Sequence, residues 1–287
     1  MSSASGVVIV DKPSAVTSHQ VVGMLRRLLG TRKIGHAGTL DPMATGVLIL
    51  GVNRATRLLG HLALHDKRYL ATVRLGASSS TDDADGDLTL VGDASHLTLD
   101  EVDAALEVQR GDISQVPSSV SAIKVDGKRA YALARAGESV ELKSRPVTIS
   151  RLDVLEVRAS DGFLDVDLDV ECSSGTYVRA IARDLGAALG VGGHLTALRR
   201  TRIGGYSLDD AVSLGDEPPA LMSMADAARL SFPVLDVTAE EATDIGFGRP
   251  IARPVPANPT GMIAPDGSLL ALYQPTAEGS RPLAVLV

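Results

Sequence analysis

Residues 35–48 read GHAGTLDPMATGVL, a stretch rich in glycine that runs directly into the apolar segment VLIL at 47–50. A short apolar run bounded by turn residues predicts a buried strand. Asp41 lies in the loop before that strand, among three glycines, and glycines let the backbone turn sharply and approach a ligand closely. The loop therefore predicts a carboxylate held on a shaped turn. An alternative stays open, because an Asp-Pro pair is also a natural helix start with Asp41 as the N-cap.

The segments around this loop predict a mixture of strands and helices. Residues 7–10 are an apolar run typical of a buried strand, and a helix follows that Thr17 or Ser18 can cap and Gly30 can end. The other expected elements are a helix over 53–65 capped by Asn53, a strand over 67–75, a helix from a capping box at 98–101 to about residue 108, a helix over 128–136, an antiparallel hairpin of 146–158 with 162–172, and a helix over 176–189. No repeating βαβ order is visible. The fold class expected is α/β in the mixed α+β sense, with a largely antiparallel central sheet flanked by helices.

The length of 287 residues allows one large domain with a small companion. Composition changes after Leu214, where GDEPP at 215–219 marks a break, and residues from about 231 onward read as short strands with turns. We therefore expect a main domain over residues 1–230 and a small β-rich domain over 231–287.

Composition also bounds the compartment and the class of protein. An apolar content of 45% is that of an ordinary globular chain, and no apolar run reaches 18 residues. The start of the chain lacks a basic segment followed by a long apolar one, so neither a membrane span nor a signal peptide is expected. The single cysteine, Cys172, shares the apolar face of its expected strand, which predicts a core thiol in a reducing compartment. We expect a cytoplasmic protein.

The net charge of −7 taken alone argues against a nucleic-acid partner. The charge is, however, arranged in blocks. Residues 12–75 carry ten basic and two acidic side chains, whereas residues 77–112 carry one basic and ten acidic ones. Residues 113–151 and 172–202 are again basic. The sequence leaves open whether these basic segments form one face or are ordinary solvated surface.

Several motifs for cofactors are weak or absent. The chain has no Gly-rich phosphate loop of the Walker or dinucleotide-binding type. His61 and His65 lack the glutamate of a zinc helix, and the acidic loop over residues 82–87 lacks the closing glutamate of a calcium loop, so it is expected to be solvated. We expect no metal site and no nucleotide cofactor.

Five segments together resemble one family. The stretch at 35–48 closely resembles the signature of the TruB family of tRNA pseudouridine synthases, which modify uridine 55 in the T-loop. Four further segments agree with that family in order: VDKP at 10–13, DKRY at 66–69, PSSVSAIK at 117–124 and CSSGTYVR at 172–179. The likeness covers residues 6–205, and the remaining tail resembles the RNA-binding PUA domain of the family only loosely.

The resemblance implies a set of site residues. Asp41 corresponds to the catalytic carboxylate, which acts at the ribose as nucleophile, stabiliser or base. Arg179 corresponds to the cation that holds this carboxylate in its charged form. Tyr69 corresponds to the tyrosine on which the extruded base stacks. His36 corresponds to a histidine that contacts RNA, and Lys12, Lys124 and Tyr177 correspond to residues that line the pocket.

The resemblance also implies partners, and rival functions remain open. A redox-neutral isomerisation of uridine in the tRNA T-arm needs no cofactor, and the absence of basic tails favours a stand-alone monomer over a guide-RNA-dependent synthase of the dyskerin type. A non-catalytic tRNA-binding or folding module is a second alternative. A glycoside-type hydrolase is a third, although hydrolases usually need two carboxylates at matched separation.

Overall fold

The computed structural model describes residues 4–118, 124–125, 128–129 and 142–287 of the chain. These residues fall into two compact units. Unit 1 comprises Met1–Pro42, Gly46–His65 and Arg202–Val287, and unit 2 comprises Met43–Thr45 and Asp66–Thr201. The chain passes from unit 1 into unit 2 after His65 and returns to unit 1 at Arg202. The short segment Met43–Thr45, within the loop at 35–48, also belongs to unit 2.

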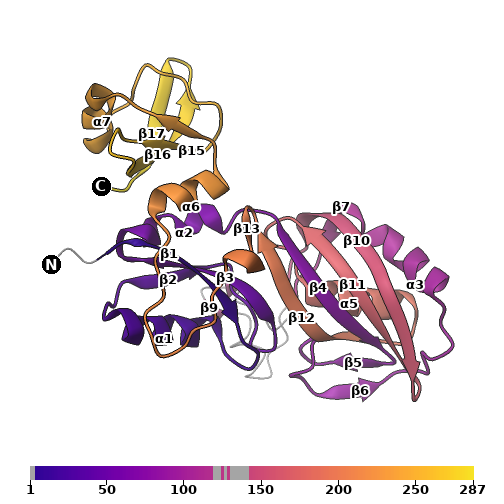
Figure 1. Cartoon of the computed structure of the whole chain (residues 1–287). Coiled ribbons are helices and arrows are strands. Elements are labelled where there is room, and N and C mark those ends of the chain that lie inside the picture. The colour runs from indigo at the N-terminus through magenta and orange to yellow at the C-terminus, as the bar shows by residue number, and fades with distance from the viewer. Residues whose placement is uncertain (1–3, 119–123, 126–127, 130–141) are drawn as a thin grey trace. The chain divides into compact units, whose positions relative to one another are not determined.

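The centre of unit 1 is a set of three antiparallel strands with β3 in the middle (Figure 1). The strands are β1 (Gly6–Lys12), β2 (Ile34–Ala37) and β3 (Thr45–Val52). The apolar runs of β1 and β3 are buried on both faces, because helices pack on either side. The predicted strands at 7–10 and 47–50 are therefore confirmed.

Helix α1 (Ser18–Leu29) covers one face of these strands with Val21, Val22 and Leu25. Its boundaries follow from local chemistry, as predicted. Thr17 forms a capping box with Gln20, and Gly30 ends the helix in the left-handed region at φ 60°.

The opposite face packs on short helices. These are η1 (Asn53–Arg57), α2 (Leu59–Leu62) and α6 (Met224–Ser231). The single helix predicted over 53–65 is wrong, and so is its cap. Asn53 has a φ of 55° and its side chain bonds Ala4 O and Thr31 Oγ1 instead of a helix end. A φ of 55° is outside the α-helical region, so Asn53 cannot begin a regular α-helix, and the segment forms the short η1 and α2 instead.

The C-terminal part of unit 1 is a second, four-stranded sheet in the order β14-β15-β16-β17 with one helix (Figure 1). Its elements are β14 (Val234–Asp236), α7 (Ala239–Gly246), β15 (Thr260–Ile263), β16 (Leu269–Thr276) and β17 (Gly279–Val285). The predicted β-rich character is confirmed, whereas α6 and α7 were not predicted. Ile263, Leu269 and Leu286 belong to the same apolar core as β1 and β3, so this sheet is packed against the N-terminal strands.

Unit 2 is built on five strands in the order β12-β4-β11-β10-β7 (Figure 1). They are β4 (Lys67–Leu75), β7 (Gly111–Gln115), β10 (Arg145–Ser160), β11 (Phe163–Cys172) and β12 (Gly193–Ile203). The pairs β4–β11, β11–β10 and β10–β7 are antiparallel, and the largely antiparallel α/β fold expected from the sequence is confirmed. Smaller strand pairs are β5 (Ala77–Ser79) with β6 (Leu88–Leu90) and β8 (Lys124–Val125) with β9 (Lys128–Arg129).

Helices pack on one face of this sheet. They are α3 (Leu99–Leu106), which is followed by η2 (Glu107–Gln109), and α5 (Val178–Ala188). The capping box of α3 is confirmed, but α5 begins at Val178, two residues later than predicted. The helix predicted over 128–136 is wrong at Lys128–Arg129, which form β9, and its residues 130–136 lie outside the described part of the chain.

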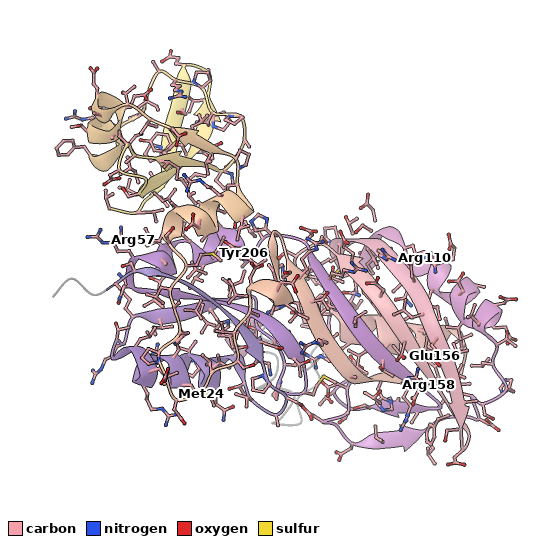
Figure 2. All side chains as sticks on the ribbon, viewed as in Figure 1. Met24, Arg57, Arg110, Glu156, Arg158 and Tyr206 are labelled. Atoms are coloured by element: carbon pink, nitrogen blue, oxygen red, sulfur yellow. The ribbon has the colours of Figure 1, made fainter. Side chains whose placement is uncertain are left out.

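The other face of the sheet carries a ladder of ion pairs between neighbouring strands. Arg68 and Arg74 of β4 bind Asp169 and Asp165 of β11. Arg158 of β10 lies beside Glu156 (Figure 2). Its guanidinium is 2.8 Å from the Glu156 carboxylate and also binds Asp167 of β11. The alternation along β11 places its aspartates on this face, which is the hydrophobic-in, polar-out pattern of a half-covered antiparallel sheet.

Candidate active site

The loop that carries Asp41 connects β2 to β3, and Asp41 itself belongs to unit 1. Gly38 and Gly46 adopt φ values of 70° and 100°, in the region that glycine enters most readily, so the loop favours glycine at both positions. Asp41 lies between them and is half-buried, and Pro42 after it is exposed. No helix begins at this Asp-Pro pair, so the alternative of a simple helix cap is not what the structure shows.

Lys12 at the end of β1 is fully buried beside this loop. Its ammonium donates to Pro13 O at 2.8 Å, Val16 O at 2.6 Å and Pro42 O at 3.2 Å. A buried charge is tolerated only when hydrogen bonds replace its hydration, and these three carbonyls do so. The contacts indicate that Lys12 fastens the loop backbone next to Asp41. A direct contact of Lys12 with RNA stays a prediction.

His36 lies on β2, opposite Leu50 of β3 in the strand register, and is half-buried. This strand leads into the loop that carries Asp41, and His36 precedes Asp41 by five residues. Lys12, His36 and Asp41 are thus all held by unit 1, and the predicted role of His36 in RNA contact is untested.

Tyr69 lies on β4 of unit 2, paired with Val170 of β11, and is 7% exposed. Its neighbours on the same strand face show why: β4 alternates between buried and exposed positions, and Tyr69, Ala71 and Val73 share the buried face, as predicted. The ring therefore lies on the covered side of the sheet. Its proposed stacking role is untested.

Arg179 lies in the first turn of α5 and is also buried. Its guanidinium donates to Thr81 O at 2.9 Å and pairs with Asp83 at 3.2 Å, with both side chains almost fully covered. A planar guanidinium held by a carboxylate keeps a fixed orientation, which suits a cation that must present further donors in one direction. Asp83 is not among the site residues predicted from the sequence.

The expectation of a solvated acidic loop over 82–87 is wrong for Asp83. Only 3% of this residue is exposed, and its carboxylate also accepts bonds from Thr81 Oγ1 at 2.5 Å and from the Asp85 N–H at 3.1 Å. Asp82 binds Arg183 on the next turn of α5. Thr81, Asp82 and Asp83 have the composition of an exposed polar turn, which gives no sign of a buried ion pair. The only signal in the sequence is the pair of arginines on α5, Arg179 and Arg183, which need acidic partners.

Tyr177 and Lys124 complete the predicted set. Tyr177 directly precedes α5, and Gln115 of β7 fixes its backbone by accepting the Tyr177 N–H at 2.8 Å and donating to Tyr177 O at 3.2 Å. Lys124 lies on β8, opposite Arg129 of β9. Unit 2 thus brings Tyr177 and Arg179 to the start of one helix, and the pocket roles of Tyr177 and Lys124 are untested.

Two titratable groups on the covered face of the sheet, Lys67 and Cys172, have shifted pKa values. Lys67 is 7% exposed, and burial, with the nearby Arg200 charge as a second cause, lowers its pKa to about 8. Burial raises the pKa of the Cys172 thiol to about 11. The predicted core position of Cys172 is confirmed at 1% exposure, and its thiol is held in the unreactive form.

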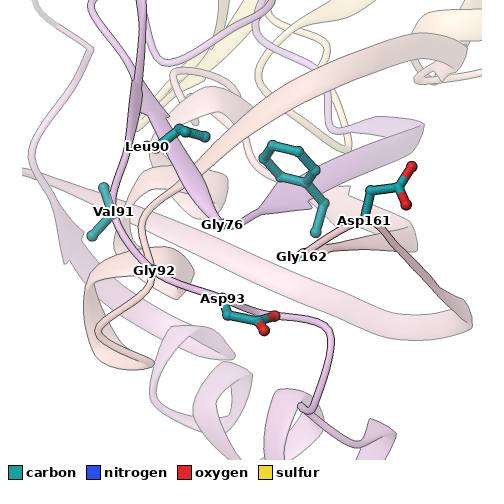
Figure 3. A pocket seen from close by; sticks show the side chains of 8 residues that line it. Gly76, Leu90, Val91, Gly92, Asp93, Asp161 and Gly162 are labelled. Atoms are coloured by element: carbon teal, nitrogen blue, oxygen red, sulfur yellow. The ribbon is translucent and has the colours of Figure 1, made fainter.

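A hollow of about 330 Å³ in unit 2 (Figure 3) has none of the predicted site residues in its lining. Its walls come from the tip of the β10–β11 hairpin and the segment after β6, and include Phe163, Asp93 and Asp161. Asp93 already accepts bonds from Ser95 N–H and Oγ. Nothing links this hollow to the site residues named above.

Two kinds of feature are absent from the residues that the structure describes. Among them, no three His, Cys, Asp or Glu side chains gather as a metal site would require. No helix in that part of the chain is both long enough and apolar enough to cross a membrane.

The fold and the loop define a class, and comparison with known proteins identifies the family. Residues 26–178 match the N-terminal domain of the TruB family pseudouridylate synthases. Residues 179–227 match the C-terminal domain described for tRNA pseudouridylate synthase B, and residues 232–287 match the C-terminal domain of tRNA pseudouridine synthase II.

Relatives of high identity cover nearly the whole chain. The tRNA pseudouridine synthase B of Cutibacterium acnes is 59% identical over 290 residues, which span 99% of this chain and 98% of that protein. The protein of the same name from Mycolicibacterium paratuberculosis is 55% identical, over 99% of this chain and 98% of its own.

Solved structures share the fold at lower identity. A chain from an H/ACA ribonucleoprotein bound to a substrate RNA containing 2′-deoxyuridine has a TM-score of 0.73 at 22% identity, over 98% of this chain and 85% of its own. A chain from a Cbf5-Nop10-Gar1 complex has a TM-score of 0.72 at 25% identity, over 98% and 83%.

The antiparallel fold with a carboxylate-bearing loop is thus that of a pseudouridine synthase, an enzyme of the isomerase class. Within that class the chain belongs to the TruB family.

Proposed function

We propose that this chain isomerises uridine 55 in the T-loop of tRNA to pseudouridine, acting alone and with Asp41 as the catalytic carboxylate. One observation carries the proposal: the identity of 59% over 99% of the chain to a protein named tRNA pseudouridine synthase B. The geometry supports it, because Asp41 is half-buried in a loop whose two ends have backbone angles that favour glycine.

The proposed reaction balances without a co-reactant. The N1–C1′ bond of the uridine breaks, the base turns, and a C5–C1′ bond forms. The hydrogen on C5 leaves to water and N1 gains one. The Asp41 carboxylate acts at the ribose, either by attack at C1′ or as a base at C2′, and both routes return the carboxylate unchanged.

Unit 2 supplies the other proposed roles. Tyr69 gives the extruded base a surface on which to stack, since a base inside a folded loop is reached only by flipping it out. Arg179 keeps the Asp41 carboxylate ionised, and its own orientation is supported by the bonds to Asp83 and Thr81 O. His36, Tyr177 and Lys124 contact the RNA around the flipped nucleotide. The domain boundary at residues 230 and 231 stays part of this proposal.

A label at uridine C5 tests the reaction. An unmodified tRNA transcript carrying tritium at C5 is mixed with the protein alone, without added metal or RNA, and about one tritium per tRNA is expected in water with no free uracil. Free uracil would instead indicate a hydrolase, and tight binding without tritium release a non-catalytic module. Release that needs added RNA would indicate a guide-dependent enzyme.

Asp41→Asn tests the residue. The substitution keeps the size and removes the charge, so we expect tRNA binding within a few-fold of the wild type and a single-turnover rate lower by several orders of magnitude. Asp216→Asn, at an exposed position of unit 1, removes the same charge and is expected to change neither value. A rate above about a tenth of the wild-type rate in Asp41→Asn would remove Asp41 from the catalytic role.

A further inference from the structure

Ser18, the first residue of α1, directs its hydroxyl into the loop that carries Asp41. The residue is 2% exposed. Its Oγ donates to Leu40 O at 3.0 Å and accepts the Leu40 N–H at 2.9 Å. Both backbone polar groups of Leu40, which is itself buried, therefore end on this one side chain. Since Leu40 directly precedes Asp41, the two bonds fix the backbone from which the carboxylate projects.

Capping of the helix does not account for the Ser18 hydroxyl. A serine at a helix start usually accepts a bond from the first turn, but here Thr17 does so. Thr17 Oγ1 accepts the Gln20 N–H at 3.1 Å, and Gln20 Oε1 accepts the Thr17 N–H at 2.7 Å. Two adjacent hydroxyls thus have separate roles, with Thr17 stabilising the helix and Ser18 holding the loop.

The loop is held on the other side of Asp41 as well. Lys12 donates to Pro42 O at 3.2 Å, and Lys12 and Ser18 stand at the two ends of the connection from β1 to α1. The residues before and after Asp41 are therefore fastened to one short segment of the same unit. Because the contact is buried, removing the hydroxyl takes away the partner that both backbone groups of Leu40 have in this structure.

We propose that Ser18 is a positioning residue for Asp41. This inference rests on the proposed function, in which Asp41 is the catalytic carboxylate. Reacting groups must be held close to the productive geometry, and a displacement of about 1 Å lowers a rate by about 100-fold. Ser18 acts on the chemical step through Leu40 and does not itself touch the substrate.

The test compares Ser18→Ala with Thr17→Ala. Both variants remove one hydroxyl from the start of α1, but only Ser18→Ala removes the bonds to Leu40. We expect the single-turnover tritium release to fall about 10- to 100-fold in Ser18→Ala and less than threefold in Thr17→Ala, with the tRNA dissociation constant within threefold of wild type in both. Ser18→Thr keeps a hydroxyl and is expected to restore most of the rate.

Amide hydrogen exchange supplies a readout that does not depend on activity. Exchange in a peptide spanning residues 38–45 is expected to accelerate in Ser18→Ala and to stay at the wild-type rate in Thr17→Ala. If Ser18→Ala does not fold, Ser18→Cys takes its place, because it keeps the volume while a thiol donates and accepts hydrogen bonds only weakly.

The outcomes separate the two proposals. Unchanged exchange in Ser18→Ala, or faster exchange with an unchanged rate, overturns the role of Ser18 alone. Equal losses of rate in the Ser18→Ala and Thr17→Ala variants also overturn it, since they would show a general effect of α1 stability. A wild-type protein that releases no tritium, or an active Asp41→Asn variant, instead overturns the proposed function and the positioning role with it.

Discussion

Unit 2 holds charged side chains in two contrasting settings on the two faces of one sheet. On the open face, Arg68 and Arg74 of β4 bind Asp169 and Asp165 of β11, and these bonds raise the pKa of both arginines. On the covered face, one residue away from Arg68, burial lowers the pKa of Lys67 to about 8. The same strand thus stabilises positive charge on one side and disfavours it on the other.

The contrast indicates which charges serve structure and which serve function. The arginines of the open face pair with aspartates one strand away and stay partly in water, so these pairs cost little. Charges on the covered face cost free energy to bury, and only partners with good geometry offset that cost. Groups that a fold keeps in such a setting are candidates for a functional site, and Arg179 with Asp83 is the clearest case.

Among the charged groups of unit 2, the largest effect is expected for Asp83→Asn. Asp83 Oδ1 accepts from Thr81 and Asp85, so an asparagine that keeps these bonds must turn its NH₂ toward the Arg179 guanidinium, donor against donor. Breaking a buried pair in this way costs about 3–5 kcal/mol. We expect that loss in urea unfolding, and a single-turnover rate lowered by about 100-fold because Arg179 loses its orientation.

The adjacent residue provides the control. Asp82 binds Arg183 at 3.5 Å from a more exposed position, and its φ of 60° is one that asparagine readily adopts. Asp82→Asn should therefore cost less than about 1 kcal/mol and leave the rate within twofold. Similar losses of stability and rate in both variants would show that any change in this loop has the effect, and that the buried Asp83–Arg179 pair has no special role.

An intermediate effect is expected for Lys67→Met, and it depends on pH. The folded protein holds the Lys67 proton less tightly than the unfolded chain does, because the pKa is about 8 in the fold against 10.5 for the ordinary group. Below pH 8 both states are protonated and the full cost of burial is present. As the pH rises from 8 to 10.5 that cost is relieved, so Lys67 makes the wild type more stable by about 3 kcal/mol over this range.

The difference between wild type and variant isolates this contribution. Urea unfolding at pH 7.5, 8.5 and 9.5 should show wild-type stability rising relative to Lys67→Met. A constant difference across the three values would mean that Lys67 keeps an ordinary pKa in the fold. Other groups that titrate in this range, which both proteins share, cancel in the comparison.

Local chemistry explains which parts of the fold could be predicted. Thr17, Gly30 and the capping box at Thr98 determine helix ends through bonds within a few residues, and the alternation along β4 and β11 follows from period two. The failures are different in kind. Asparagine is a favoured helix cap. The side chain of Asn53, however, bonds Ala4 and Thr31, which are distant in sequence, and these contacts accompany its different conformation.

The same distinction applies to the candidate site. The loop around Asp41 could be predicted because its glycines and the family motif it resembles occupy consecutive residues. Asp83 was missed because its partner Arg179 lies 96 positions further along the chain, and a polar turn gives no sign of burial. Ser18 was predicted only as one of two possible helix caps, because its bonds to Leu40 depend on packing between segments 22 residues apart.

The smallest effect is expected on the open face, for Asp165→Asn. Asp165 accepts two bonds from Arg74, at 2.8 and 2.7 Å, but the arginine side chain is 39% exposed and also lies over the Phe163 ring. Solvent screening limits such a pair, so we expect a loss below about 1 kcal/mol in urea unfolding. The single-turnover rate should stay within twofold.

The substitution also removes a negative charge, so if the open face touched RNA, the affinity for tRNA would rise, most clearly at low salt. An unchanged dissociation constant from low to moderate salt would support the assignment of this face to structure, and tighter binding would contradict it.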